Sequence, residues 1–216
     1  MVKKMEDRHS GWIRLFHWIN MIAITLLVLT GFYIHSPHGF RLFANMDNAR
    51  MLHFAMAYLL CFGVVGRVYY AIVTGDAKNV WFDFKTDPKK FPSMIKYYTF
   101  MADDHPYYGK YNPGQKMMYS GFLFMVIIQV VTGFILYKPQ VVFWSTLGDY
   151  LGGEIALRMI HLIITWLFVL AVVAHVYLDI SEGVPVLKSM FNGKIPADFH
   201  HGYHEEEVED DKGISA

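Results

Sequence analysis

Two histidines enclose one of the most apolar stretches of the chain, the segment HLIITWLFVLAVVAH from His161 to His175. Fourteen residues of α-helix rise about 21 Å and turn to within about 40° of four full turns, so the two imidazoles share one helix face at two depths. An imidazole in such a place is a metal ligand, part of a proton relay or a hydrogen-bonded core residue. The spacing therefore predicts chemistry at two separate levels of one helix.

Four segments are long and apolar enough to cross a bilayer. Hydrophobic residues make up 54% of the 216 residues and charged residues only 18%, and the mean hydropathy is +0.27, which is atypical of a soluble domain. The formal net charge of zero gives no electrostatic argument for a nucleic-acid partner. The predicted fold class is an all-α, integral membrane four-helix bundle, with spans at about residues 12–34, 52–73, 117–137 and 155–180.

Basic residues predict the orientation of the bundle. The N-terminal tail, the connection over residues 74–116 and the C-terminal part are rich in lysine, whereas the other two connections carry only Arg41 with Arg50 and Lys138. Both termini and the middle connection are therefore predicted to be cytoplasmic. The predicted regions are a tail at 1–11, a four-helix domain at 12–180 with a cytoplasmic interfacial segment at 76–112, and a tail at 181–216.

Two polar stretches lie outside the spans. DPKKFPSMIKYYTFMADDHP has Asp and Pro at a plausible helix start, which predicts a short helix at the cytoplasmic interface, with an ordered loop as the alternative. The last stretch, HHGYHEEEVEDDKGISA, is acidic and predicted to be disordered, and its histidines are interpreted as solvated rather than as a metal site. We detect no internal repeat.

Four histidines sort into two pairs when they are placed by depth. In the predicted orientation, His17 and His175 lie near the inner side, and His53 and His161 lie near the outer side. Two imidazoles that face each other across a bundle are the usual axial ligands of a six-coordinate b-type haem. Such a haem has no free axial position, so its chemistry is electron transfer rather than oxygen binding. The pattern predicts two b haems and an electron path across the membrane.

Glycine and arginine residues recur at matching positions. Gly31 lies fourteen residues after His17, so it shares that helix face at the outer level and leaves room for a porphyrin. Arg67 is at the same spacing from the outer-level histidine of its own helix and needs a counter-charge, such as a haem propionate or a quinone oxygen. Arg14 inside and Arg158 outside are candidates for the same role. The alternative for all three arginines is interfacial snorkelling.

The chain resembles a known family of four-helix cytochromes. RLFHWINMIAITLLVLTGFYI, ARMLHFAMAYLLCFGVVGRVYYAIVTG and HVYLDISEGVPVLKSMFNGKI resemble the di-haem cytochrome b subunit of membrane-bound nickel–iron hydrogenases. GKYNPGQKMMYSGFLFMVIIQVVTGFILYKP is also similar to the gamma (cytochrome b) subunit of respiratory formate dehydrogenase. The resemblance covers about residues 10 to 195. The helix 2 and helix 4 motifs favour the hydrogenase branch, and the entry to helix 3 favours formate dehydrogenase about as much.

The resemblance implies the two ends of the electron path. The outer haem takes electrons from a periplasmic iron–sulfur small subunit, itself bound to a nickel–iron large subunit, and the inner haem passes them to menaquinone or ubiquinone. The matching quinone residues are Asn112 and Gln115, with Gly114 for close approach and His105 in the preceding loop. The resemblance implies a multi-pass subunit of a larger complex in a bacterial or archaeal inner membrane, without dehydrogenase activity of its own.

Other interpretations remain beside this one. Within the redox class, the chain is alternatively the formate dehydrogenase subunit or a quinol-oxidising anchor of another periplasmic redox complex. Outside that class, the histidines form a relay in an ion or proton transporter, or the chain is a structural anchor. A relay requires neither pairing at equal depth nor a glycine opposite a ring, so the redox class is favoured. The YNPGQ stretch, taken by itself, is equally a turn and helix cap.

Overall fold

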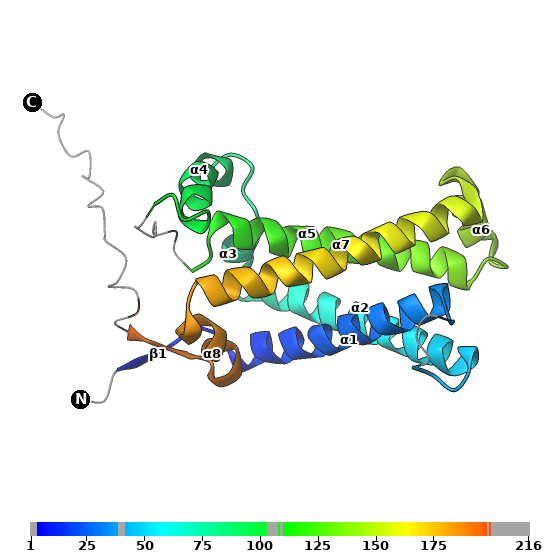
Figure 1. Ribbon diagram of the computed structural model, residues 1–216, viewed down its shortest axis with the longest axis horizontal. Helices are drawn as coiled ribbons and strands as arrows, with labels where there is room; N and C mark the ends of the chain where they lie inside the picture. The colour runs from blue at the N-terminus through cyan, green and yellow to red at the C-terminus, as the bar shows by residue number, and fades with distance from the viewer. Residues whose placement is uncertain (1–3, 39–41, 103–107, 109, 198, 200–216) are drawn as a thin grey trace, which may run out of the picture.

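Four long helices dominate the computed structural model, which describes residues 4–38, 42–102, 108, 110–197 and 199 (Figure 1). The helices have 25, 28, 25 and 29 residues, long enough to cross a membrane. The four predicted spans are therefore confirmed as helices, each extended by one to six residues at one or both ends. The helices are α1 (Gly11–His35), α2 (Met46–Val73), α5 (Pro113–Tyr137) and α7 (Gly153–Ser181).

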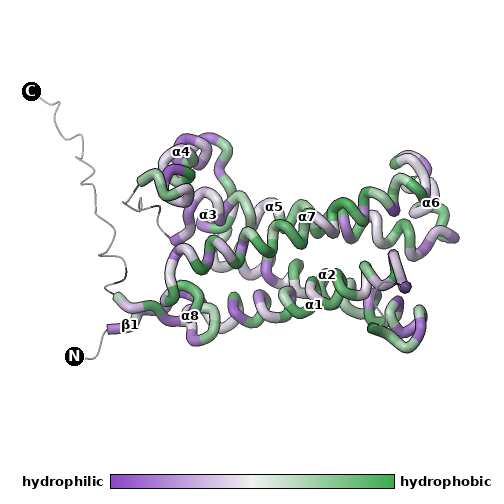
Figure 2. Tube along the Cα trace, viewed as in Figure 1, coloured by the Kyte–Doolittle hydropathy of each residue, from purple (hydrophilic) through white to green (hydrophobic). Residues whose placement is uncertain are grey.

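The outer surface of these helices is apolar. Between 6% and 17% of the most apolar window of each helix is buried inside the protein. Large side chains such as Phe62, 75% exposed, and Leu170, 65% exposed, point outward. Hydrophobic colours dominate the middle of the long helices in Figure 2. Because so much contiguous apolar surface is unfavourable in water, the bundle is suited to lipid.

The helices pack as two hairpins. Helix α1 packs along α2, and α5 packs along α7, whereas α2 and α5 approach each other at few positions. Glycines allow the close approach in the first hairpin, because a Cβ on Gly66 would lie 2.6 Å from the ring of Phe16. Figure 1 shows α1 and α2 on one side of the bundle and α5 and α7 on the other. Buried side chains from all four helices form one cluster between the hairpins.

Polar side chains cap the starts of three long helices. The Ile13 N–H donates to Ser10 Oγ at 3.3 Å, and the Asn48 N–H donates to Asn45 Oδ1 at 2.8 Å. Asn112 begins α5 with a reciprocal capping box. These residues satisfy backbone donors that the first helical turn leaves unpaired. The starts of the helices are thus encoded locally.

The connection between the hairpins contains α3 (Ala77–Val80) and α4 (Asp87–Tyr98). Helix α4 lies where the sequence predicts a short helix, and its position at the membrane interface stays a prediction. The buried carboxylate of Asp87, 1% exposed, accepts from the Asp83 N–H at 2.8 Å. It also pairs with Lys116 Nζ at 3.4 Å. This carboxylate therefore ties the connection to the start of α5.

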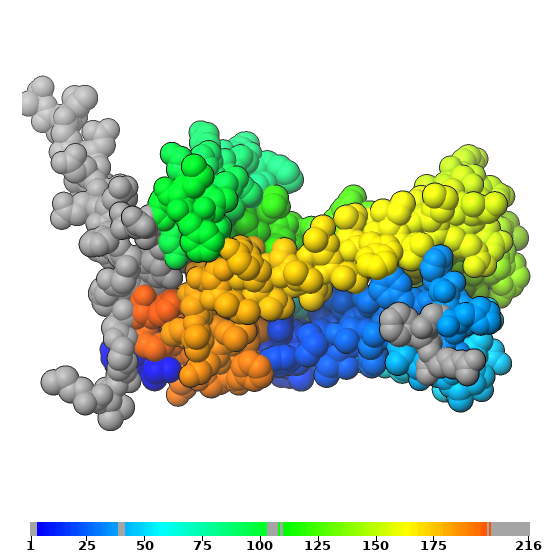
Figure 3. All heavy atoms as spheres, in the orientation of Figure 1, coloured from blue at the N-terminus to red at the C-terminus, as the bar shows by residue number. Residues whose placement is uncertain are grey.

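The chain ends carry structure that the sequence pattern does not predict. Helix α8 (Val184–Asn192) and strand β2 (Lys194–Pro196) follow α7, and β2 pairs antiparallel with β1 (Met5–Asp7). Figure 3 shows this C-terminal part against the start of the chain. Three-residue strands have no readable period, and their pairing joins residues far apart in sequence. The predicted tail at 200–216 lies outside the described residues.

The bundle has two ends that differ in the elements they carry. The terminal end carries β1, α8 and the α3–α4 connection (Figure 1). The α6 end carries helix α6 (Val142–Tyr150), the end of α1 and the start of α2.

Candidate functional site

The structure brings the four intramembrane histidines together in two pairs. At the α6 end, the ring centres of His53 on α2 and His161 on α7 lie 6.4 Å apart, with the ring planes at 54°. At the terminal end, the ring centres of His17 on α1 and His175 on α7 lie 6.3 Å apart, at 56°. Each pair joins one histidine from each hairpin.

These separations fit one metal ion between each pair of rings. With a metal–nitrogen bond of about 2 Å and about 1.2 Å from nitrogen to ring centre, two trans imidazoles have ring centres about 6.4 Å apart. Direct contact between the two imidazole rings would give a different arrangement, because aromatic rings that touch are offset or tilted so that their atoms lie in van der Waals contact. The observed spacing therefore leaves room for an ion and for a flat ligand around it.

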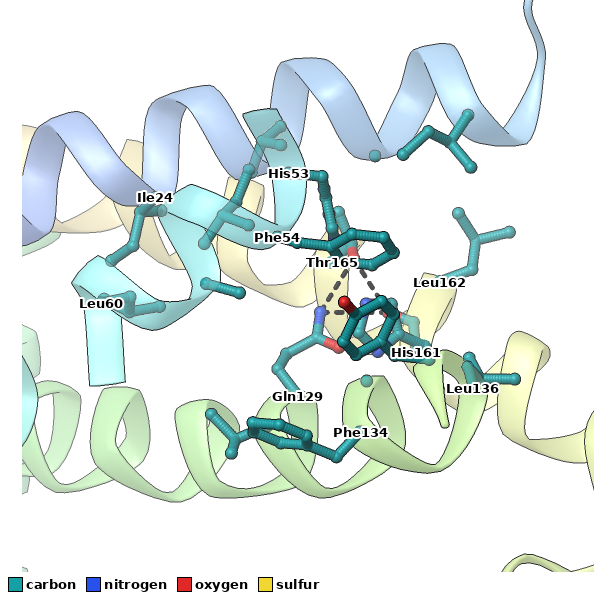
Figure 4. A pocket seen from close by; sticks show the side chains of 18 of the residues that line it. Ile24, His53, Phe54, Leu60, Gln129, Phe134, Leu136, His161, Leu162 and Thr165 are labelled. Atoms are coloured by element: carbon teal, nitrogen blue, oxygen red, sulfur yellow. Dashed lines mark hydrogen bonds between the residues drawn. The ribbon is translucent and has the colours of Figure 1, made fainter. Parts of the chain in front are cut away.

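A cavity of about 560 Å³ surrounds the pair at the α6 end, within the range of about 300–1,000 Å³ for cofactor pockets. Figure 4 shows His53 and His161 reaching into it from α2 and α7. Gly31 borders this cavity, and Gly133 borders it from α5. A Cβ on either glycine would lie 3.5 Å from the Cε1 atom of the adjacent histidine. These two glycines therefore border the cavity beside the rings without a side chain of their own.

One apolar layer separates the two histidine pairs. It contains one buried residue from each long helix, and Phe168 lies seven residues from each histidine of α7. The members of this layer are at most 6% exposed. The four residues are Ala23, Leu60, Val126 and Phe168.

Two threonines contact the histidines at the α6 end, and neither is among the site residues predicted from the sequence. Thr30 Oγ1 lies 2.9 Å from His53 Nδ1, and Thr132 Oγ1 lies 2.8 Å from His161 Nδ1. The available sequence signal was a Thr-Gly-Phe tripeptide that occurs once in α1 and once in α5.

Nitrogen atoms without partners gather at the terminal end. Among the residues that the structure describes, Arg8 Nε, His9 Nδ1, Arg14 Nε and His17 Nδ1 are buried and lack a hydrogen-bond partner. Buried polar atoms are usually paired, so this cluster indicates a missing acceptor. A carboxylate is the acceptor that guanidinium groups bind best.

The three predicted arginines have different partners. Arg67 pairs with the Asp76 carboxylate at 2.9 Å, and Asp76 also pairs with Lys110 at 3.2 Å. The counter-charge is thus a carboxylate of the chain itself, where the sequence predicts a haem propionate or a quinone oxygen. Arg14 donates to the Phe191 carbonyl of α8. Arg158 borders the cavity and forms an exposed ion pair with Glu154, one turn earlier, at 2.6 Å.

Two groups at the terminal end have shifted pKa values. Burial opposes ionisation of Asp76, but Lys110, Asn79 and Arg67 outweigh burial and hold its pKa below the usual range. Burial, reinforced by the positive charges of Arg8 and Lys110, lowers the pKa of His9 to about 3. His9 is therefore neutral at physiological pH.

The residues predicted to bind quinone form the start of α5. Asn112 Oδ1 accepts from the Gln115 N–H at 2.8 Å, and Gln115 Oε1 accepts from the Asn112 N–H at 3.0 Å. The Asn112 amide also donates to Glu182 at 2.6 Å and to Tyr98 at 2.9 Å. A Cβ on Gly114 would lie 3.1 Å from the sulfur of Met94 in α4. His105 lies outside the described residues.

Paired imidazoles between two hairpins of membrane-length helices are the architecture of a membrane-embedded cytochrome. No group of three His, Cys, Asp or Glu residues suited to a metal ion occurs in the described part of the chain, whereas a porphyrin needs only two axial ligands. The comparison with protein families is more specific. The model of the prokaryotic cytochrome b561 family matches residues 8–193, and the chain belongs to this family. It is therefore a multi-pass inner-membrane protein of electron transport that uses b-type haem.

Several curated relatives align with this chain over most of their own length. A probable Ni/Fe-hydrogenase B-type cytochrome subunit from Cupriavidus necator is 29% identical over 202 residues, which covers 84% of this chain and 83% of the relative. The protein of the same description from Rhodobacter capsulatus is 26% identical over 218 residues, covering 91% and 81%. A probable Ni/Fe-hydrogenase 1 B-type cytochrome subunit from Escherichia coli K12 is 24% identical over 207 residues, covering 84% and 86%.

Proposed function

We propose that the chain conducts electrons across the membrane between the iron–sulfur subunit of a periplasmic nickel–iron hydrogenase and quinone at the cytoplasmic side. Two b haems are held by His17 with His175 and by His53 with His161. The observation that carries the proposal is the presence of two facing imidazole pairs at two levels of one bundle, with ring centres 6.3 and 6.4 Å apart. Bound haem supplies one-electron redox chemistry at each level.

The surroundings of the pairs support this assignment. Gly31 and Gly133 border the cavity at the α6 end, where Arg158 also lies. At the terminal end, the unpaired nitrogens of Arg8 and Arg14 offer donors to carboxylates such as haem propionates. Arg67 is close to the same end but already has a carboxylate partner, Asp76, in the described residues. We therefore propose that Arg67 stabilises the fold beside the inner site through this ion pair.

The distance between the two levels also suits electron transfer. The two histidines of α7 are fourteen residues apart, which corresponds to about 21 Å along the helix. The layer that contains Phe168 fills this interval with apolar side chains. Haem edges extend well beyond the metal, so the path between the edges is shorter than the path between the metal positions.

The start of α5 is the proposed quinone site, with Asn112, Gly114 and Gln115 in the described part and His105 before it. Support comes from the resemblance and from the polar neighbours Glu182 and Tyr98, which bond to the Asn112 amide. A quinone needs hydrogen-bond donors at its carbonyls and an apolar environment for its ring and tail. The capping contacts show that the same side chains also stabilise the helix start.

The partner assignment rests on the relatives. The three described above are named as hydrogenase cytochrome subunits, and each aligns over at least 81% of its own length. The basic residues of the middle connection and both chain ends support a cytoplasmic terminal end. The proposed electron flow is therefore from the α6 end towards the terminal end.

The test is a haem count with redox titration on the purified complex. We expect two b haems per chain, reduced by hydrogen. His161→Ala and His53→Ala should each remove one and the same haem, and His175→Ala and His17→Ala should each remove the other. The exposed His38→Ala control should retain both. Loss of the same haem in His17→Ala and His53→Ala would contradict the pairing. Reduction by formate but not hydrogen would favour a formate dehydrogenase, and absence of haem would favour a proton relay.

A further inference from the structure

The two histidines at the α6 end are held in the same way by the two hairpins. In the first hairpin, Thr30 of α1 contacts His53 of α2 at 2.9 Å. In the second, Thr132 of α5 contacts His161 of α7 at 2.8 Å. In both cases the contact joins the threonine Oγ1 to the imidazole Nδ1, and the threonine lies on the helix that packs against the histidine's own helix.

Each threonine hydroxyl also contacts a carbonyl of its own helix. Thr30 Oγ1 lies 2.6 Å from the Leu26 carbonyl oxygen, and Thr132 Oγ1 lies 2.7 Å from that of Ile128. A carbonyl oxygen only accepts, and a hydroxyl has one hydrogen to donate. The hydroxyl hydrogen therefore goes to the carbonyl, and the imidazole Nδ1–H donates to the hydroxyl oxygen. This is the assignment in which both short contacts are hydrogen bonds.

The assignment fixes the tautomer of both rings. A neutral imidazole with its proton on Nδ1 has its free lone pair on Nε2, the atom that is then available to a metal. The residue after each threonine is a glycine, Gly31 or Gly133, and a Cβ there would meet the ring at an ordinary contact distance of 3.5 Å. The threonine hydroxyl is thus the group that sets the protonation pattern of each ring.

The pair at the terminal end has no such arrangement. His17 Nδ1 is buried without a hydrogen-bond partner. His175 has a different neighbour, because its Nε2 lies 3.5 Å from the carboxylate of Asp179 one turn later. The two pairs have nearly the same ring spacing but differ in what contacts the rings.

We propose that Thr30 and Thr132 are positioning residues that tune the redox potential of the haem at the α6 end, an inference that rests on the proposed function. By accepting the Nδ1–H bond, each hydroxyl increases the basicity of the ligating imidazole. A more basic ligand favours oxidised iron over reduced iron. The two hydroxyls therefore lower the midpoint potential of this haem without touching it.

The test compares valine and serine at the two positions in the purified complex. Thr30→Val and Thr132→Val remove the hydroxyl at nearly constant volume, whereas Thr30→Ser and Thr132→Ser retain it. Thr25→Val is the matched control, since Thr25 also bonds to a carbonyl four residues earlier, at 2.8 Å, but is exposed. The readouts are the midpoint potentials of both haems and the electron paramagnetic resonance signal of the oxidised haems.

We expect each valine variant to raise the potential of one haem only, the one that His161→Ala removes. A tenfold loss of preference for oxidised iron corresponds to about 59 mV for a one-electron couple. Loss of this haem in the valine variant, with retention in the serine variant, would also support positioning, because outer partners of a metal ligand strengthen metal binding about 10–100-fold. The serine variants and Thr25→Val should resemble the unmodified protein.

Three results would overturn the inference. They are unchanged potentials in both valine variants, a shift confined to the other haem, and equal effects of valine and serine. Each of them is interpretable only when the unmodified complex carries two b haems. If it does not, the proposed function itself fails, so the two failures are distinguishable.

Discussion

The Asp76 carboxylate offers the most direct test of how the terminal end is held together. It is 9% exposed and lies within 2.9 Å of Arg67 and 3.2 Å of Lys110, whose side chains are 21% and 30% exposed. Its pKa is held below the usual range by these partners despite its burial. Asp76→Asn keeps the shape of the side chain but leaves two cations without their counter-charge.

The expected loss of stability follows from the burial of these groups. Removing one partner of a fully buried ion pair costs about 3–5 kcal/mol. Because water reaches part of both cations here, we expect about 2–3 kcal/mol, which lowers the melting temperature by about 4–12 °C for a chain of this size. The assay is thermal unfolding of the purified protein in one detergent, followed by circular dichroism.

Glu154→Gln provides the matched control. Glu154 and Arg158 form an ion pair of 2.6 Å, but their side chains are 69% and 68% exposed. Such a pair contributes at most about 1 kcal/mol. The double variant Arg67→Gln/Asp76→Asn should lose less than the sum of the two single variants, because it leaves only Lys110 without a counter-charge and Arg67 is no longer an unpaired cation. Equal melting temperatures for Asp76→Asn and Glu154→Gln would refute the reasoning.

Two further predictions concern pH and packing. The pKa of His9 is about 3 in the folded protein and about 6.5 in an unfolded chain, so the unfolded state binds the extra proton between these values. Stability should therefore fall from pH 7 to pH 5, with a contribution from His9 of about 2 kcal/mol. His9→Gln should remove this part of the pH dependence of the melting temperature, and His38→Gln at an exposed site should not. Gly66→Ala places a Cβ 2.6 Å from the ring of Phe16 and should destabilise the first hairpin by about 1–3 kcal/mol. Gly121→Ala meets no atom within 4 Å and should leave stability unchanged or raise it by up to about 1 kcal/mol, so a melting temperature that falls equally in both glycine variants would contradict the packing argument.

The long helices could be predicted because their determinants are local. Twenty or more apolar residues in sequence specify a membrane helix by length and composition alone. Ser10, Asn45 and Asn112 mark three of the starts through their own side chains. The depth of each histidine follows from counting residues along a regular helix, so the expectation that His17 faces His175 needs only the helical rise and an up-and-down topology.

The contacts between distant segments could not be predicted in this way. Strand β1 pairs with β2 across nearly the whole chain, and neither strand is long enough to show a pattern. The counter-charge of Arg67 comes from Asp76, where the sequence suggested a haem propionate or quinone. Asn112 and Gln115 were associated with quinone by resemblance, and the fold gives them a capping role as well.

The sequence by itself determined the number of spans, the depths of the histidines and the composition of the lipid-facing surface, because each depends on residues close together along the chain. Only the tertiary structure decided which side chains form hydrogen bonds with the rings of those histidines. Thr30 and Thr132 belong to a recurring Thr-Gly-Phe tripeptide, but a tripeptide does not specify the ring that it contacts. That contact depends on how α1 packs against α2 and α5 against α7, and helix packing is fixed by side chains on both partners at once.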